Sequence, residues 1–181
     1  MKVALSDLTD DIVRQPSLLP GWTVGHVVTH LARNADSVIR RLRGAARGEI
    51  ADQYAGGATA RAAEIQAGAA RTAQALVSDA VEASDNVDAA FASFPSECWG
   101  RMARSVSGQL QPVGLLPFGR WREVDVHLVD LGLGPTASGW PEELAERWLP
   151  ELLPRLSERA DPRALLAWAL RRGPAPELDP W

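Results

Sequence analysis

The sequence is poor in the residue types that cross-link chains or bind metals. It contains one cysteine, Cys98, and only three histidines among 181 residues. A single cysteine excludes an internal disulfide and is typical of a protein from a reducing compartment. Because free cysteine often packs as a small apolar side chain, Cys98 needs no chemical role. Any metal site must therefore be built from a few histidines and carboxylates.

The sequence also lacks an excess of positive charge and a long hydrophobic run. Its net charge is −4 and its pI is about 5.4, which argues against nucleic acid as a partner. No apolar stretch reaches the roughly 18 residues that a membrane span needs, and residues 1–11 contain no hydrophobic signal core. We therefore expect a cytoplasmic protein, with one main domain and at most a small appendage.

The apolar periodicity indicates helices along most of the chain. Thr23 is a candidate N-cap for an amphipathic helix from Val24 to about Arg43, with Gly44 as its stop. The alanine-rich residues 59–83 contain no proline and predict one long helix. Further helices are predicted over residues 3–14, 85–93, 141–159 (bent by its prolines) and 163–172, with an irregular stretch at 95–119.

The most informative pattern combines two of the three histidines with a glutamate. Glu123 and His127 are separated by four residues, so a helix would place both on one face. His30 would join them from a distant helix. Three N/O ligands leave positions open for water or substrate, as in a catalytic zinc site. Periodicity alone leaves residues 120–131 open, because their apolar positions fit a strand as well as a helix.

Four motifs resemble the mycothiol-dependent maleylpyruvate isomerase family, within the DinB-like group of metal-binding helical bundles. They are SLLPGWTVGHVVTHLARNAD at 17–36, QYAGG with the following RAAEI at 53–65, RWREVDVHLVDLGLG at 120–134 and LLAWALRRG at 165–173. The resemblance implies an all-α fold, a helix at 120–131, and one divalent cation, usually Zn²⁺. It assigns the ligands to His30, Glu123 and His127.

Both ends of the chain depart from this family. Only about 15 residues precede the LPGW turn, where the family has a full helix, and residues 141–159 or a second subunit could replace that helix. The strands of the family's small C-terminal α/β domain are missing between Arg159 and Arg163. We therefore predict a DinB-like bundle at 1–135 and a reduced, mostly helical C-terminal region at 136–181. The family's functional arginine corresponds to Arg172.

Other residues near the motifs are candidates for binding and positioning, each with a structural alternative. Arg120 and Arg122 can bind substrate carboxylates or can be solvated. Trp22 can form a pocket wall or a core anchor. Asn34 can bind substrate or cofactor, and both Asn34 and Asp130 can orient ligands or make ordinary interhelix hydrogen bonds. His26 is better explained as a capping or interhelix contact.

The resemblance implies an enzyme that uses mycothiol and a metal to isomerise maleylpyruvate to fumarylpyruvate. A first alternative is a mycothiol S-transferase acting on another small-molecule electrophile. A second is a binding or regulatory bundle without catalysis, although structural zinc normally takes four protein ligands. The residues do not determine the metal, the electrophile or whether the chain forms a homodimer.

Overall fold

The computed structural model describes residues 1–179, which form two compact units, 1–137 and 138–179. The first unit contains α1 (Lys2–Leu5), α2 (Asp10–Val13), α3 (Val24–Ala46), α4 (Gly57–Ala69), α5 (Ala73–Ala92) and α6 (Leu116–Asp130). A small antiparallel hairpin, β1 (Met102–Arg104) and β2 (Leu110–Pro112), precedes α6, with Ala103 opposite Gln111. The expected all-α bundle is therefore confirmed. The assignment of residues 1–135 to a metal-binding bundle and of 136–181 to a reduced C-terminal region stays a prediction.

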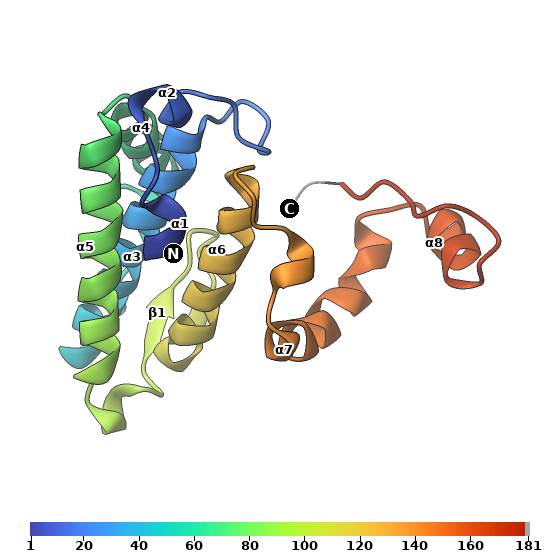
Figure 1. The fold of residues 1–181 in the computed structure, drawn as a ribbon. Coiled ribbons are helices and arrows are strands. Elements are labelled where there is room, and N and C mark those ends of the chain that lie inside the picture. Colours follow the sequence, from blue (N-terminus) through green and yellow to red (C-terminus); the bar gives the residue numbers. More distant parts are fainter. Residues whose placement is uncertain (180–181) are drawn as a thin grey trace. The chain divides into compact units, whose positions relative to one another are not determined.

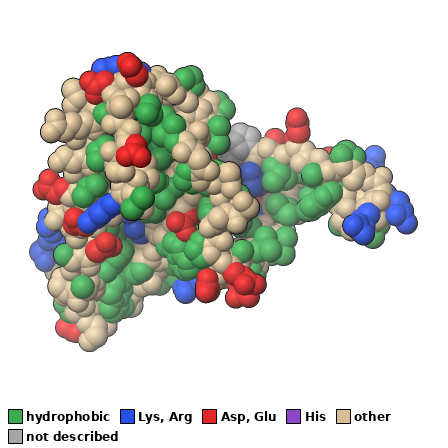
Figure 2. Space-filling model, in the orientation of Figure 1, with side chains coloured by type: hydrophobic (Ala, Val, Ile, Leu, Met, Phe, Trp, Pro, Cys, Tyr) green, Lys and Arg blue, Asp and Glu red, His purple; other side chains and the backbone are tan. Residues whose placement is uncertain are grey.

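Helix α3 is the central element of the first unit (Figure 1). Thr23 caps its N-terminus as predicted, because its hydroxyl accepts from the amide of His26 while the ring of His26 bonds back to the Thr23 amide. Its buried stripe, from Val24 to Ala45, packs against α4, α5 and α6. Acidic and basic side chains are interspersed over the face of this unit shown in Figure 2.

Helix α3 does not stop at Gly44 as predicted but continues to Ala46. A Cβ at Gly44 would lie 2.6 Å from the Cβ of Ala51, so a glycine is needed here for the following loop to approach the helix closely. Gly68 of α4 has a similar role, because its Cβ would meet the Thr29 methyl of α3 at 2.4 Å. Gly44 and Gly68 therefore mark places where α3 is approached closely, by the loop at residue 51 and by α4.

The single helix predicted over residues 59–83 is wrong. The chain breaks at residues 70–72, and Thr72 caps a new helix by accepting from the amide of Ala75. Asp10 also accepts from the free amide of Ala73 at that end. Helix α5 then continues to Ala92, so the separate helix expected at 85–93 is its second half. The predicted helix at 3–14 is likewise two short helices, which contribute Leu5 and Val13 to the core.

The stretch at 116–130 is a helix, which excludes the strand alternative for this segment. Helix α6 starts four residues before the predicted position, with Pro117 in its first turn, where its missing N–H costs no hydrogen bond. The expected irregular segment at 95–119 therefore contains the hairpin and the first turn of α6.

The second unit contains α7 (Glu142–Leu152) and α8 (Pro162–Ala169). The helix predicted at 141–159 changes to 3₁₀ geometry over Leu153–Glu158, where Pro154 cannot donate an α-helical hydrogen bond. Asp161 caps α8 through the amides of Arg163 and Ala164, and the helix ends three residues earlier than predicted. Residues 138–179 contain no strand, as the sequence predicted.

Candidate metal centre

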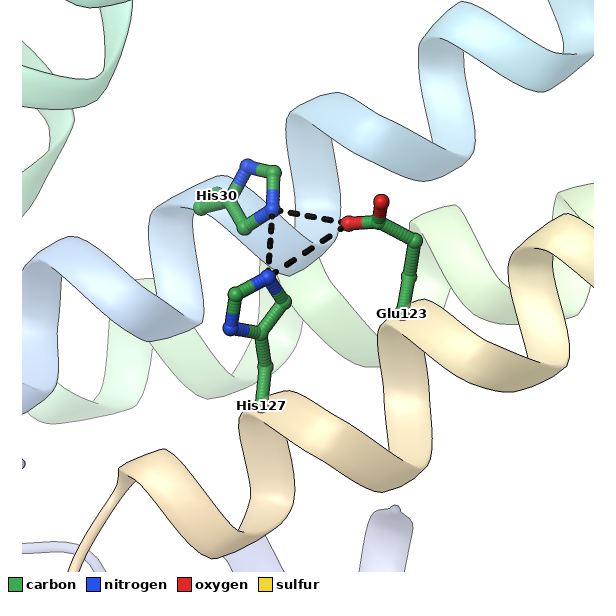
Figure 3. Close-up of side chains that lie close together, drawn as sticks. All are labelled: His30, Glu123 and His127. Atoms are coloured by element: carbon green, nitrogen blue, oxygen red, sulfur yellow. Dashed lines mark hydrogen bonds and ion pairs between the residues drawn. The ribbon is translucent and has the colours of Figure 1, made fainter. Parts of the chain in front are cut away.

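Three side chains from α3 and α6 meet at one point in the first unit (Figure 3). His30 Nε2 lies 2.9 Å from Glu123 Oε2 and 3.0 Å from His127 Nε2. The third side of the triangle, from His127 Nε2 to Glu123 Oε2, measures 3.5 Å. The structure therefore brings together the three residues that the sequence identified as a ligand set.

The two helices expose these side chains to different degrees. His30 lies on the buried face of α3, and its side chain is only 3% exposed. Glu123 and His127 stand one turn apart on α6, with side chains that are 36% and 18% exposed. The cluster therefore has a buried wall on α3 and a solvent-accessible edge on α6.

The geometry of the triangle fits a small divalent cation. Ligand bonds of about 2.0–2.2 Å at tetrahedral angles keep N and O ligand atoms about 3.3 Å apart. The three observed separations, 2.9, 3.0 and 3.5 Å, bracket that value. With only three protein donors, the coordination sphere keeps a place for an exogenous ligand. Imidazole and carboxylate donors suit Zn²⁺ and also Ni²⁺, Co²⁺ or Fe²⁺.

The electrostatics of the cluster keep its carboxylate ionised. Burial alone would raise the pKa of Glu123, but hydrogen bonds from His127 and His30 outweigh burial and hold it well below its usual range. Burial lowers the pKa of His30, and the bond to Glu123 offsets only part of that effect. Burial also opposes the charge of His127, yet Glu123 and Asp130 together raise its pKa above the ordinary value.

Asp130 lies where it can orient a ligand. Its Oδ2 is 2.8 Å from His127 Nδ1, on the ring edge opposite the cluster. With its proton on Nδ1, the neutral ring could present the Nε2 lone pair to a cation, which is the arrangement that metal-bound histidines commonly adopt. The LPGW turn also reaches this end of α6, because the Leu18 amide donates to the Asp130 carbonyl.

The predicted binding residues occupy varied positions. Arg120 is buried and donates to Leu31 O at 2.8 Å and to Asn34 Oδ1 at 2.9 Å, so both Arg120 and Asn34 link α6 to α3. Trp22 contacts the His30 ring edge-on, with centroids 5.7 Å apart. Arg122 lies over the Phe118 ring. Contact of these residues with a substrate or cofactor stays a prediction.

Arg172 belongs to the second unit. It donates to the carbonyls of Leu170 and Arg171, and its side chain is exposed. Its catalytic role stays a prediction. His26, in contrast, makes the structural contacts expected of it, since it completes the α3 cap and its Nε2 lies 3.1 Å from Gln66 Oε1 on α4.

Two arginines beside the cluster were not singled out from the sequence. Arg61 of α4 places Nη2 at 3.1 Å from His30 Nδ1, and its guanidinium lies 5.6 Å from the Tyr54 ring centroid. Arg41 of α3 is buried, which lowers its pKa to about 10. Two signals were available: Tyr54 and Arg61 fall in the motif at 53–65, and Arg41 follows His30 by eleven residues, close to three helical turns.

A groove of about 1000 Å³ lies elsewhere on the first unit, between α3, α5 and residues 49–52. It is lined by Asp36, Arg40 and Arg43 among others, and it shares no residue with the cluster. In the part of the chain that the structure describes, the ligand triangle is the one group of three or more His, Cys, Asp or Glu side chains close enough to hold a metal ion. Among residues 1–179, no helix combines the length and apolar character that crossing a bilayer demands.

Comparisons with known proteins identify a family and a similar fold. A family profile described as the mycothiol maleylpyruvate isomerase N-terminal domain matches residues 2–132. A crystal structure of a histidine-to-alanine mutant of the mycothiol-dependent maleylpyruvate isomerase aligns with 27% identity and a TM-score of 0.79, covering 83% of this chain and 62% of that one. A second crystal structure of that isomerase aligns with 23% identity and a TM-score of 0.82, covering 97% and 90%. A search of curated proteins finds no match.

Proposed function

Because the chain belongs to the mycothiol maleylpyruvate isomerase N-terminal domain family, we propose that it is a metal-dependent isomerase using mycothiol. The proposed reaction converts the cis double bond of maleylpyruvate to the trans bond of fumarylpyruvate. The single observation that carries the proposal is the meeting of His30, Glu123 and His127, whose ligand atoms lie within 4.8 Å of one another, with no fourth His, Cys, Asp or Glu ligand in the group among residues 1–179. Zn²⁺ is the proposed metal.

The residues of the chain fit such a reaction. A divalent cation and a thiol together supply a thiolate nucleophile, whose reversible addition to a double bond allows cis and trans forms to interconvert. Glu123 offers an ionised oxygen, and His30 offers a neutral imidazole because burial lowers its pKa. Asp130 fixes the ring of His127 so that Nε2 points into the site. The buried wall on α3 keeps water from one side of the site.

Two measurements test this proposal. Purified protein should contain about one equivalent of metal, and His127→Ala should contain almost none. His26→Gln is the matched control, because glutamine at that position preserves the cap of α3 and lies outside the triangle. The zinc-loaded chain should convert maleylpyruvate only when mycothiol is added. Equal metal content in wild type and His127→Ala would refute the proposed site.

A mycothiol S-transferase is the second candidate. It stands beside the isomerase because the two aligned isomerase structures share only 27% and 23% identity with this chain, which leaves the electrophile open. Metal binding with mycothiol consumption, but without conversion of maleylpyruvate, would identify a transferase.

A further inference from the structure

Arg61 makes a hydrogen bond to His30, one of the three proposed metal ligands, and this bond is incompatible with a metal bound to the same ring. Its Nη2 lies 3.1 Å from His30 Nδ1. A guanidinium only donates hydrogen bonds, so Nδ1 must accept and the ring proton must lie on Nε2. That assignment agrees with the other contact of the ring, because Nε2–H then donates to Glu123 Oε2 at 2.9 Å. In a metal-free site, the contacts of His30 with Arg61 and with Glu123 are therefore both satisfied by one tautomer, with the ring proton on Nε2.

A cation bound at Nε2 makes that network impossible. Nε2 must then present its lone pair to the metal, and the proton of the neutral ring moves to Nδ1. Two donors, Nδ1–H and the guanidinium of Arg61, would face each other at 3.1 Å. His127 has no such conflict, because its Nδ1 already faces the carboxylate of Asp130. Loading the metal therefore requires Arg61 to leave His30.

Arg61 has few other attachments. Among the described residues it forms no ion pair, and its remaining contact is the Tyr54 ring. It lies in the first half of α4, whereas the buried residues of that helix, Ile65 and Ala69, lie in the second half. Gly56 and Gly57, both with positive φ, precede it. Its side chain can thus move without disturbing the core.

The other arginines near the site are less suited to bind a ligand. Arg120 is buried and bonds Leu31 and Asn34 through Nη1 alone, while its Nε and Nη2 have no hydrogen-bond partner among the described residues. Arg41 is buried as well, with its Nε donating to Ser37 O. Burial keeps both guanidinium groups from the half-exposed edge of the site, where a ligand would enter. Arg61 is half-buried, and its guanidinium lies against Nδ1 of His30, on the opposite side of the ring from the ligand atom Nε2. A guanidinium in this position matches a carboxylate, which it binds through two charge-assisted hydrogen bonds.

We infer that Arg61 is the carboxylate-binding residue of the loaded site, and that metal binding frees it from His30 to take the distal carboxylate of a dicarboxylate substrate. This inference rests on the proposed function, since it supplies the recognition of a doubly charged electrophile. Arg61 thereby couples occupancy of the metal site to selection of substrate charge.

The test compares two inert probes, succinate and its half-amide succinamate, by calorimetry on the zinc-loaded full chain. Wild type should bind succinate about tenfold or more tightly than succinamate, because only succinate offers a second carboxylate to Arg61. The ratio should fall to nearly one in Arg61→Gln. Arg40→Gln is the matched control, because Arg40 is exposed on α3 away from the cluster and should preserve the ratio.

A second measurement follows zinc affinity by competition with a chelating dye. Arg61→Gln should bind zinc as tightly as wild type or a few-fold more tightly, since a competing donor and a nearby positive charge are removed. A preserved succinate preference in Arg61→Gln, or a tenfold loss of its zinc affinity, would overturn the inference. Neither measurement uses a thiol or turnover. A charge preference that depends on Arg61 in a protein without isomerase activity would therefore support the inference and count against the proposed function alone.

Discussion

Helices α3 and α6 carry the candidate site but differ in almost every other respect. Helix α3 has 23 residues, most of them buried, whereas α6 has 15, of which only Leu116, Phe118 and Arg120 are buried. The histidine of α3 has a lowered pKa and the histidine of α6 a raised one, although their ring centroids are 4.5 Å apart. Burial dominates on α3, and neighbouring carboxylates dominate on α6.

The two helices therefore contribute differently to the site. The core helix supplies a fixed, neutral donor, and the half-exposed helix supplies charge and the means to adjust it. Position on α3 is secured by packing along most of its length, whereas α6 is held by a few buried side chains such as Leu116 and by the polar contacts of Arg120 with α3. Four experiments separate these contributions.

The largest expected effect is on metal affinity. His30→Ala and His127→Ala should each weaken zinc binding by at least about 100-fold, because each leaves only two protein donors. Competition with a chelating dye would measure both, with His26→Gln as a control expected to match wild type. If only one of the two alanine variants loses zinc, the cation is not shared between the helices.

The next effect concerns the attachment of α6 to α3. Arg120→Met should lower the free energy of unfolding by about 2 kcal/mol, because Leu31 O and Asn34 Oδ1 lose a buried donor. Arg122→Met, on the half-exposed part of the same helix, should cost under about 1 kcal/mol. Urea denaturation measures both. Equal losses in the two variants would mean that Arg120 does not anchor α6.

A smaller effect is expected from the charge behind His127. Asp130→Asn should weaken zinc binding about tenfold, since the carboxylate orients the ring and increases its basicity. In the metal-free protein it should also lower the pKa of His127, which Asp130 helps to raise. NMR titration would follow the ring directly. Asp125→Asn, whose carboxylate accepts from Trp121 Nε1, is the control on the same helix.

The smallest effect is in the acid stability of the chelator-treated protein. Glu123 has a pKa in the fold below the ordinary 4.5, so its ionisation stabilises the fold above that pH and the contribution is lost as pH falls. Between pH 5 and 3.5 wild type should lose about 1 kcal/mol more than Glu123→Gln, a figure reduced for partial exposure. Glu64→Gln, at an exposed position, should behave as wild type. If wild type, Glu123→Gln and Glu64→Gln lost stability in parallel as the pH falls, the ionised Glu123 would not stabilise the fold.

The sequence predicted best where local signals and burial agree. Helix α3 has a capping threonine and a regular apolar stripe, and both its start and its buried face are as expected. The identity of the α6 segment as a helix came from family resemblance, because its apolar positions also fit a strand. The three proposed ligands meet in space, while their binding of a metal stays a prediction.

Prediction failed where tertiary contacts decide the outcome. Alanine composition cannot reveal a break at residues 70–72 that is stabilised by Asp10, more than sixty positions away. Glycine is a common signal for the end of a helix, but Gly44 lies within α3 and allows close contact with Ala51. Arg61 was missed for the same reason, since only the packing of α4 on α3 brings it to His30.

Gly68 gives that packing an unusual sensitivity. A Cβ at Gly68 would collide with the side chain of Thr29, the residue before His30. The spacing between α4 and α3 therefore requires a glycine at position 68. An alanine there would act as a wedge some two turns from Arg61, tilting α4 outward and lifting the guanidinium off the imidazole. Contact between Arg61 and His30 thus depends on Gly68, a residue without a side chain.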